Sequence, residues 1–267
     1  MVEIIDAHAH VFPDRIAVHA TKGIEDFYHM RTRFDGTVDK LLELGEAAGI
    51  RRFLIQSVAT APAQVAHINT FIAATVQAQP DRFIGFATLH PEMTNPAAEL
   101  ERALEMGLRG VKLHPDFQRF PIDDRRAYPI YALCEHTCPI LLHMGDSRYA
   151  YSHPRLLVPV LRDFPGLRFI CAHFGGWSEW TEAETYLAGT GVWVDTSSTL
   201  YTLPPEKALA LIAAFGEDHI VFGSDYPMWE PGQELRRLLD LGLPQQTLDK
   251  ILSGNLCRLL DLPQEGA

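Results

Sequence analysis

Short apolar segments alternate with helical segments along the whole chain, and this alternation constrains the fold more than any other feature. The apolar segments are rich in Val, Ile, Leu and Phe, which is typical of buried strands. The eight expected strands cover residues 4–11, 52–58, 83–89, 110–114, 139–145, 168–173, 191–196 and 220–225. Strands that alternate with helices favour a parallel sheet covered by helices. Eight such units in 267 residues predict an α/β fold, a (β/α)8 TIM barrel formed as a single domain by residues 1–267.

An open, doubly wound sheet is the alternative fold. Its dinucleotide-binding form carries a G-x-G-x-x-G sequence between the first strand and the following helix. No such sequence follows the first expected strand, and the Gly189-x-Gly191 pair precedes a strand instead of a helix. The sequence therefore favours the closed barrel.

Residues 12–36 are too long a stretch to be a simple connector. The stretch is polar and aromatic, and it includes Phe27, Tyr28 and His29. Long loops in compact domains usually act as lids or binding loops. We expect this stretch to be a functional loop.

Composition limits the partners of the chain. Its 34 acidic and 23 basic residues give a formal net charge of −11, which argues against nucleic acid and anionic membranes as partners. No apolar run approaches the roughly 18 residues of a membrane span, and the N-terminus lacks a signal-peptide pattern. We expect a cytoplasmic protein with a small-molecule substrate. Barrels of this type often form homodimers, but no residue here specifies an interface.

The four cysteines form no C-x-x-C pair. Their positions in expected helices and strands are typical of buried free thiols, and we expect neither a disulfide nor a zinc finger.

Histidines and one aspartate fall at the C-terminal ends of the expected strands. His8 and His10 end the first strand on one face, because residues two apart in a strand point the same way. His143, His173 and Asp225 end the fifth, sixth and eighth strands. The C-terminal ends of barrel strands meet at one mouth, where barrel enzymes have their active sites. Neutral imidazoles and a carboxylate suit Zn²⁺, and also Mn²⁺, Fe²⁺ or Co²⁺, so the sequence predicts a metal site, most simply zinc.

Several motifs resemble those of the amidohydrolase superfamily. They are H-x-H at 8–10, LLHMG at 141–145, CAHFGG at 171–176 and FGSDYP at 222–227. GVKLHP at 110–115 and GNLCRLL at 254–260 are also similar to this superfamily. The set spans nearly the whole chain and is most similar to the amidohydrolase-2 branch of metal-dependent hydrolases and decarboxylases.

The resemblance implies roles for the residues at the strand ends. His8, His10 and His143 would bind the metal, and Asp225 would be a ligand or a proton acceptor. His173 would be a further ligand or the catalytic acid/base.

Three roles remain open for Lys112, which lies on the fourth expected strand. In binuclear relatives a carboxylated lysine or a glutamate on this strand bridges two metals. A lysine that binds a substrate carboxylate, or one enclosed in the barrel, fits the motif at least as well. His114 is nearer the mouth and is expected to contact substrate, whereas Asp6 is expected to be a structural carboxylate.

Four arginines lie in loops on the expected substrate side: Arg31, Arg33, Arg119 and Arg148. In an acidic protein they indicate a carboxylate-bearing substrate, with Arg148 among the substrate-binding residues. Acidic side chains in the same loops are the competing partners of these arginines.

Three functions are compatible with these residues. The leading hypothesis is a metal-dependent hydrolase that uses a metal-activated water on a small organic substrate. The alternative is a non-oxidative, metal-dependent decarboxylase of the same branch. The third is a metal-binding barrel without turnover. The metal motifs alone do not separate the first two.

Overall fold

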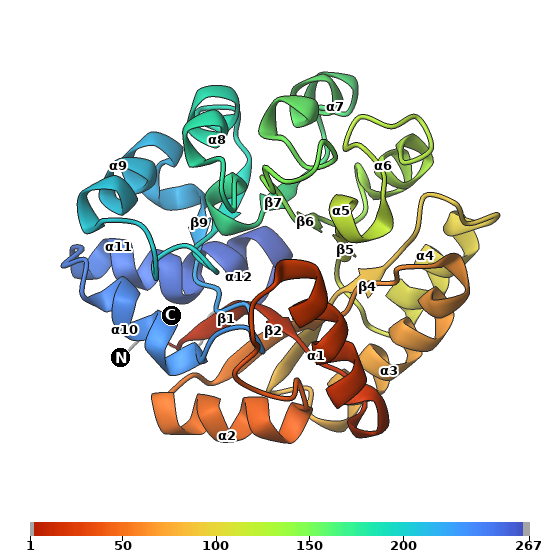
Figure 1. The fold of residues 1–267 in the computed structure, drawn as a ribbon, viewed down its shortest axis with the longest axis horizontal. Coiled ribbons are helices and arrows are strands. Elements are labelled where there is room, and N and C mark those ends of the chain that lie inside the picture. The colour runs from red at the N-terminus through yellow and green to blue at the C-terminus, as the bar shows by residue number, and fades with distance from the viewer. Residues whose placement is uncertain (1–2, 264–267) are drawn as a thin grey trace.

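The computed structural model describes residues 3–263 and has the expected α/β barrel, with helices arranged around central parallel strands (Figure 1). The strands are β1 (Ile5–His10), β2 (Arg52–Gln56), β3 (Phe83–Gly85), β4 (Ala87–Thr88), β5 (Val111–Leu113), β6 (Ile140–Leu142), β7 (Phe169–Cys171), β8 (Trp193–Asp195) and β9 (Ile220–Val221). Each expected strand is therefore present, and the prediction of the fold class is confirmed.

The third expected strand is divided into β3 and β4 at Phe86. The pairing order is β1-β2-β3 in one sheet and β4 to β9 in the other, with all pairs parallel. The Phe86 amide still donates to the Ile55 carbonyl at 3.0 Å, and the next amide donates to Gly110 on the other side at 2.8 Å. The barrel closes where Ala7 donates to the Phe222 carbonyl at 2.7 Å.

The helices connect the strands and cover their outer side. They are α1 (Asp14–Tyr28), α2 (Val38–Ala48), α3 (Val65–Ala78), α4 (Pro96–Glu105), α5 (Pro115–Gln118), α6 (Tyr128–Cys134), α7 (Leu157–Asp163), α8 (Trp180–Leu187), α9 (Pro205–Phe215), α10 (Pro231–Leu239), α11 (Gln245–Asp249) and α12 (Asn255–Leu260). Local signals set their ends: the Asn95 side chain caps α4, and Gly49 ends α2 in the left-handed conformation.

The expectation of a functional loop over residues 12–36 was wrong in its structure, because most of this stretch forms α1. Only Ala17 and Thr21 of this helix are buried. The helix is nonetheless amphipathic, because Ile16, Ala20 and Ile24 recur four residues apart on one face, so its helical period was present in the sequence. Its position beside the barrel mouth nevertheless places its last turn against the candidate site.

Two apolar layers hold the barrel. The larger lies between the strands and the surrounding helices. The smaller contains Ile5, Leu54, Ile170 and Val221 from strands β1, β2, β7 and β9, together with α12 residues such as Leu256. The four cysteines are buried and free, as expected. None of the helices in residues 3–263 is long and apolar enough to cross a membrane.

We expect Gly110→Ala to destabilise the protein by about 1–3 kcal/mol, because the site is already filled. A Cβ at Gly110 would lie 2.4–2.6 Å from three atoms of the buried Phe86 ring. Gly23→Ala in α1 is the control, since its Cβ would meet nothing within 4 Å; it is expected to stabilise the helix by up to about 1 kcal/mol. Urea unfolding midpoints test both, and equal midpoints for Gly110→Ala and wild type would contradict this packing.

Candidate active site

His8, His10 and Asp225 bring three ligand atoms together at the barrel mouth. The two imidazoles extend from the end of β1, and their Nε2 atoms lie 3.2 Å apart. Asp225 Oδ1 lies 3.5 Å from each of these atoms. Two imidazoles and one carboxylate at this spacing are a donor set that suits a divalent transition metal.

A strained backbone places the Asp225 carboxylate. Asp225 has φ 62°, which is unusual outside glycine, and its amide donates to the His8 carbonyl at 2.8 Å. Its Oδ2 accepts a hydrogen bond from Ser198, whose hydroxyl in turn accepts from the Trp229 indole at 2.8 Å. Burial raises the pKa of Asp225 to about 7. Such strain is concentrated at functional sites, where surrounding contacts maintain it.

Asp195, the last residue of β8, is a site residue that the sequence motifs did not reveal. Its Oδ2 lies 2.8 Å from His8 Nδ1, and its Oδ1 accepts from the His173 and Ser197 amides at 3.0 Å. With Nδ1–H donated to this carboxylate, His8 Nε2 is unprotonated and can act as a hydrogen-bond acceptor or a metal ligand. A carboxylate behind a histidine ligand is the usual arrangement around protein-bound metals. The signal for Asp195 was its place at a strand end, the same signal that identified the histidines.

His143 and His173 form a pair beside the metal-ligand set. His173 Nδ1 lies 3.1 Å from the Ser197 carbonyl, which can only accept, so this nitrogen carries the proton. His173 Nε2 then faces His143 Nδ1 at 3.0 Å. His143 Nε2 has no hydrogen-bond partner and lies 3.7 Å from Asp116 Oδ2. The assignment of both histidines as further metal ligands stays a prediction.

Lys112 is fully buried within this cluster, with Nζ 3.2 Å from His8 Nε2. Burial lowers the pKa of Lys112 to about 8. Burial also holds the pKa of His8 and His10 well below the usual value, so both imidazoles are neutral, as metal binding requires. His8 Nε2, His10 Nε2 and Asp225 Oδ1 lie within 3.5 Å of one another and line the cavity. The donor set therefore fits a divalent metal. Asp6, as expected, is structural, because its Oδ1 accepts from the His8 and Ser224 amides.

Tyr28, at the end of α1, lines the same cavity as the metal-ligand set. His114 is stacked between Phe117 and His143, with ring centroids 3.9 and 3.8 Å away. Its Nδ1 accepts from the Phe117 amide at 3.2 Å, so the proton of a neutral His114 is on Nε2. That proton is donated to the Tyr28 oxygen at 2.9 Å, which leaves the tyrosine's own proton free. Burial raises the pKa of Tyr28 well above its usual value, so the hydroxyl remains a donor.

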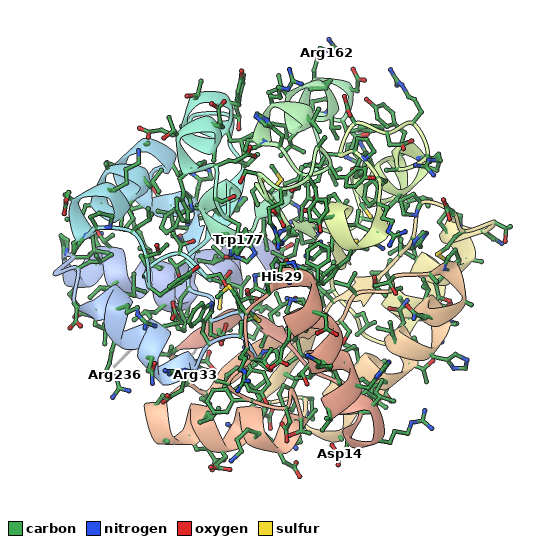
Figure 2. The ribbon with its side chains drawn as sticks, viewed as in Figure 1. Asp14, His29, Arg33, Arg162, Trp177 and Arg236 are labelled. Carbon is green, nitrogen blue, oxygen red and sulfur yellow. The ribbon has the colours of Figure 1, made fainter. Side chains whose placement is uncertain are left out.

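Arg148 fixes the end of α1. Its guanidinium binds both oxygens of Asp146, at 2.9 and 2.7 Å, and donates to the Phe27 carbonyl at 2.9 Å. It also lies over the rings of Tyr28 and Trp177. Figure 2 labels Trp177 and His29, the residue that follows α1, and the Trp177 ring lies 5.2 Å from the ring of Tyr28. The expected role of Arg148 in substrate binding stays a prediction, and its present contacts are with protein groups.

The other arginines differ in position. Arg33 donates to the Gln233 side chain at 2.6 Å, whereas Arg119 lines the main cavity. This cavity measures about 1100 Å³ and opens onto His8, His10, His143, His173 and Asp225. The predicted site residues therefore share one cavity, apart from Lys112, which is buried behind it, and Arg148.

Comparison with known proteins identifies relatives. The family model described as Amidohydrolase matches residues 5–262. A 2-keto-4-carboxy-3-hexenedioate hydratase from a Sphingobium strain is 34% identical over 147 residues, or 45% of this chain and 42% of the hydratase. A 2-amino-3-carboxymuconate-6-semialdehyde decarboxylase from Dictyostelium discoideum is 24% identical over 239 residues, or 73% of this chain and 66% of the decarboxylase. The matches thus span less than two thirds of either relative.

Solved structures show the same fold. A 5-carboxyvanillate decarboxylase from Sphingomonas paucimobilis has a TM-score of 0.78 at 15% identity, with 98% of this chain and 100% of that chain covered. A dihydroxybenzoic acid decarboxylase from Polaromonas with bound manganese has a TM-score of 0.76 at 19% identity, with 98% and 97% covered. At these identities the similarity establishes the barrel.

We expect Asp195→Asn to weaken metal binding by about 10- to 100-fold, because the amide no longer fixes His8 with Nε2 unprotonated. Competition with a chromophoric chelator for Zn²⁺ and Mn²⁺ measures this affinity. Asp240→Asn, on an exposed residue after α10, is the matched control and should bind as wild type does. A His8→Ala/His10→Ala double variant should lose the metal entirely. Equal metal affinity of Asp195→Asn and wild type would show that Asp195 does not orient His8 for metal binding.

Proposed function

The chain belongs to the Amidohydrolase family, and from this premise we propose that it is a divalent-metal-dependent decarboxylase of a small unsaturated or aromatic carboxylic acid. The observation that carries the proposal is the fixed hydroxyl donor of Tyr28 in the same cavity as the His8, His10 and Asp225 ligand set. Similar proteins that act as decarboxylases support this alternative better than the hydrolase hypothesis.

His8, His10 and Asp225 are the proposed metal ligands, and Mn²⁺ and Zn²⁺ are the first metals to test. When bound, the metal supplies a Lewis acid that polarises oxygen atoms of the substrate. Lys112 adds a positive charge beside the ligand set, with Nζ 3.2 Å from His8 Nε2. A carboxylate substrate is therefore attracted to this end of the cavity.

Tyr28 is the proposed oxyanion donor. Loss of CO2 leaves an electron pair on carbon, which conjugation delivers to an oxygen of an unsaturated or phenolic acid. A neutral donor held in advance near that oxygen lowers the barrier, because it needs no reorganisation during the reaction. His114 holds the Tyr28 hydroxyl in place, because it donates a hydrogen bond to the Tyr28 oxygen at 2.9 Å. The hydroxyl proton of Tyr28 must then point away from His114.

His173 and His143 are the proposed source of the proton. The bond from carbon to the carboxylate breaks, the electron pair stays on carbon, and one proton replaces CO2 there. The facing nitrogens of the two rings hold a proton between them at 3.0 Å, and both residues line the cavity. Asp116, 3.7 Å from His143 Nε2, is the nearest carboxyl group through which that proton is replaced.

Hydration of a carbon–carbon double bond is the second candidate. A hydratase that is 34% identical to this chain over 147 residues supports this second candidate. Hydration would add the mass of one water to the substrate and release no CO2, so the products separate the two reactions.

We expect the metal-loaded protein to release CO2 from one member of a panel of dihydroxybenzoates and carboxymuconate-type acids. In D2O the product should carry one deuterium at the carbon that lost CO2. Mass spectrometry with headspace CO2 detection measures both. Water-derived ¹⁸O in the product without CO2 would overturn the proposal in favour of hydrolysis or hydration, and no turnover of any class would favour the barrel without activity.

We expect Tyr28→Phe to lower kcat by about 10²- to 10³-fold, because it removes one oxyanion donor. The folded protein should keep its metal affinity, since Tyr28 is not in the ligand set. Tyr186→Phe, on an exposed residue of α8, is the matched control and should leave kcat unchanged. A change in KM alone would show that Tyr28 binds substrate but does not stabilise the developing charge.

A further inference from the structure

The cavity at the active site continues beyond the catalytic residues into an outer arm between α1 and α3. We define the outer arm by three residues of α1 and three of α3 that line it: Ile16, Ala20, Ile24, Ile68, Phe71 and Ala74. Figure 1 shows α1 on the α3 side of the barrel. The arm and the site form one space of about 1100 Å³, which is at or beyond the upper end of the size of pockets for small ligands.

The outer arm is lined by two helical faces. Ile16, Ala20 and Ile24 are spaced four residues apart and therefore share one face of α1. Ile68 and Phe71 face them from α3, and both are only half-buried. Ile16 is 43% exposed, so the described residues do not cover the arm completely. Apolar side chains that line an open cavity in this way favour an apolar ligand.

Charge further restricts the ligand. Among the described residues that line the cavity, the only carboxylates are Asp116 and Asp225, and both lie at the catalytic end. The charged or titratable groups toward the outer arm are Arg15, His19 and His67. The arm therefore offers no anionic partner for a cationic chain. An uncharged apolar chain buries surface against the helices without leaving a charge unpaired.

We propose that the outer arm binds an extended apolar portion of the substrate, an alkyl or aryl extension, while the carboxylate end lies at the metal-ligand set. The inference rests on the proposed function for the reacting end alone. The walls of the arm themselves come from α1 and α3, which contribute no metal ligand. Acids that carry such an extension are therefore expected to bind more tightly than the corresponding acids without it.

The experiment measures binding of butanoate, hexanoate, octanoate and decanoate to the Mn²⁺-loaded protein by calorimetry. In wild type the affinity should rise by roughly two- to fourfold per methylene as the chain enters the arm. Ala20→Trp fills the arm from α1, and should abolish this rise while butanoate binds as before. Val18→Trp is the matched control, because Val18 is 74% exposed on the same helix and does not line the cavity.

Ala74→Trp fills the arm from the opposite wall and replaces Ala20→Trp if that variant does not fold. Ala78→Trp, one turn further along α3 and outside the cavity, is its control. A flat affinity series in wild type, or the same rise in the filled variants as in wild type, would overturn the proposal. Sedimentation of wild type as a dimer that only the filled variants dissociate would do the same, and would assign the arm to a second copy of the chain.

The same data separate this proposal from the decarboxylase proposal. If affinity rises with chain length but no acid releases CO2, the outer arm binds apolar chains and the decarboxylase proposal is wrong. If short acids release CO2 but affinity does not change with chain length, the decarboxylase proposal is supported and the proposal for the outer arm is wrong.

Discussion

The contact between Asp195 and His8 is the interaction on which the rest of the site depends. The Asp195 carboxylate accepts one hydrogen bond from Nδ1–H of His8 and two more from the backbone amides of His173 and Ser197. It thereby fixes the orientation of one imidazole and the backbone that carries another. A buried carboxylate is stable only when such donors surround it, so the same hydrogen bonds that satisfy Asp195 also organise the catalytic end of the barrel.

Helix α1 has a second organising role, because it brings a hydroxyl donor to a site that the strands alone would leave open. The helix buries little of its own surface, and contacts at its end compensate for this. Arg148 joins the Phe27 carbonyl to Asp146, and His114 donates to the Tyr28 oxygen. The position of Tyr28 therefore depends on residues from two different strand-to-helix connections.

One cavity combines these two parts of the molecule. Its inner end is polar and is built on strand ends, which are rigid and hold ligand atoms at fixed distances. Its outer arm lies between two helices and is mainly apolar. In the proposed function the strands would determine the chemistry and the helices the size of the substrate, as in other barrels whose loops and helices vary around a constant frame.

The sequence by itself determined the barrel and the place of His8, His10, His143, His173 and Asp225 at its mouth, because strand period and the polarity of parallel strands are local rules. Tertiary structure alone decided three other features. Asp195 meets His8 across 187 positions, the Tyr28 hydroxyl meets His114 across 86 positions, and Arg148 donates to the Phe27 carbonyl across 121 positions. Such pairings depend on which side chains the closed barrel brings within hydrogen-bond distance, and no local pattern records that distance.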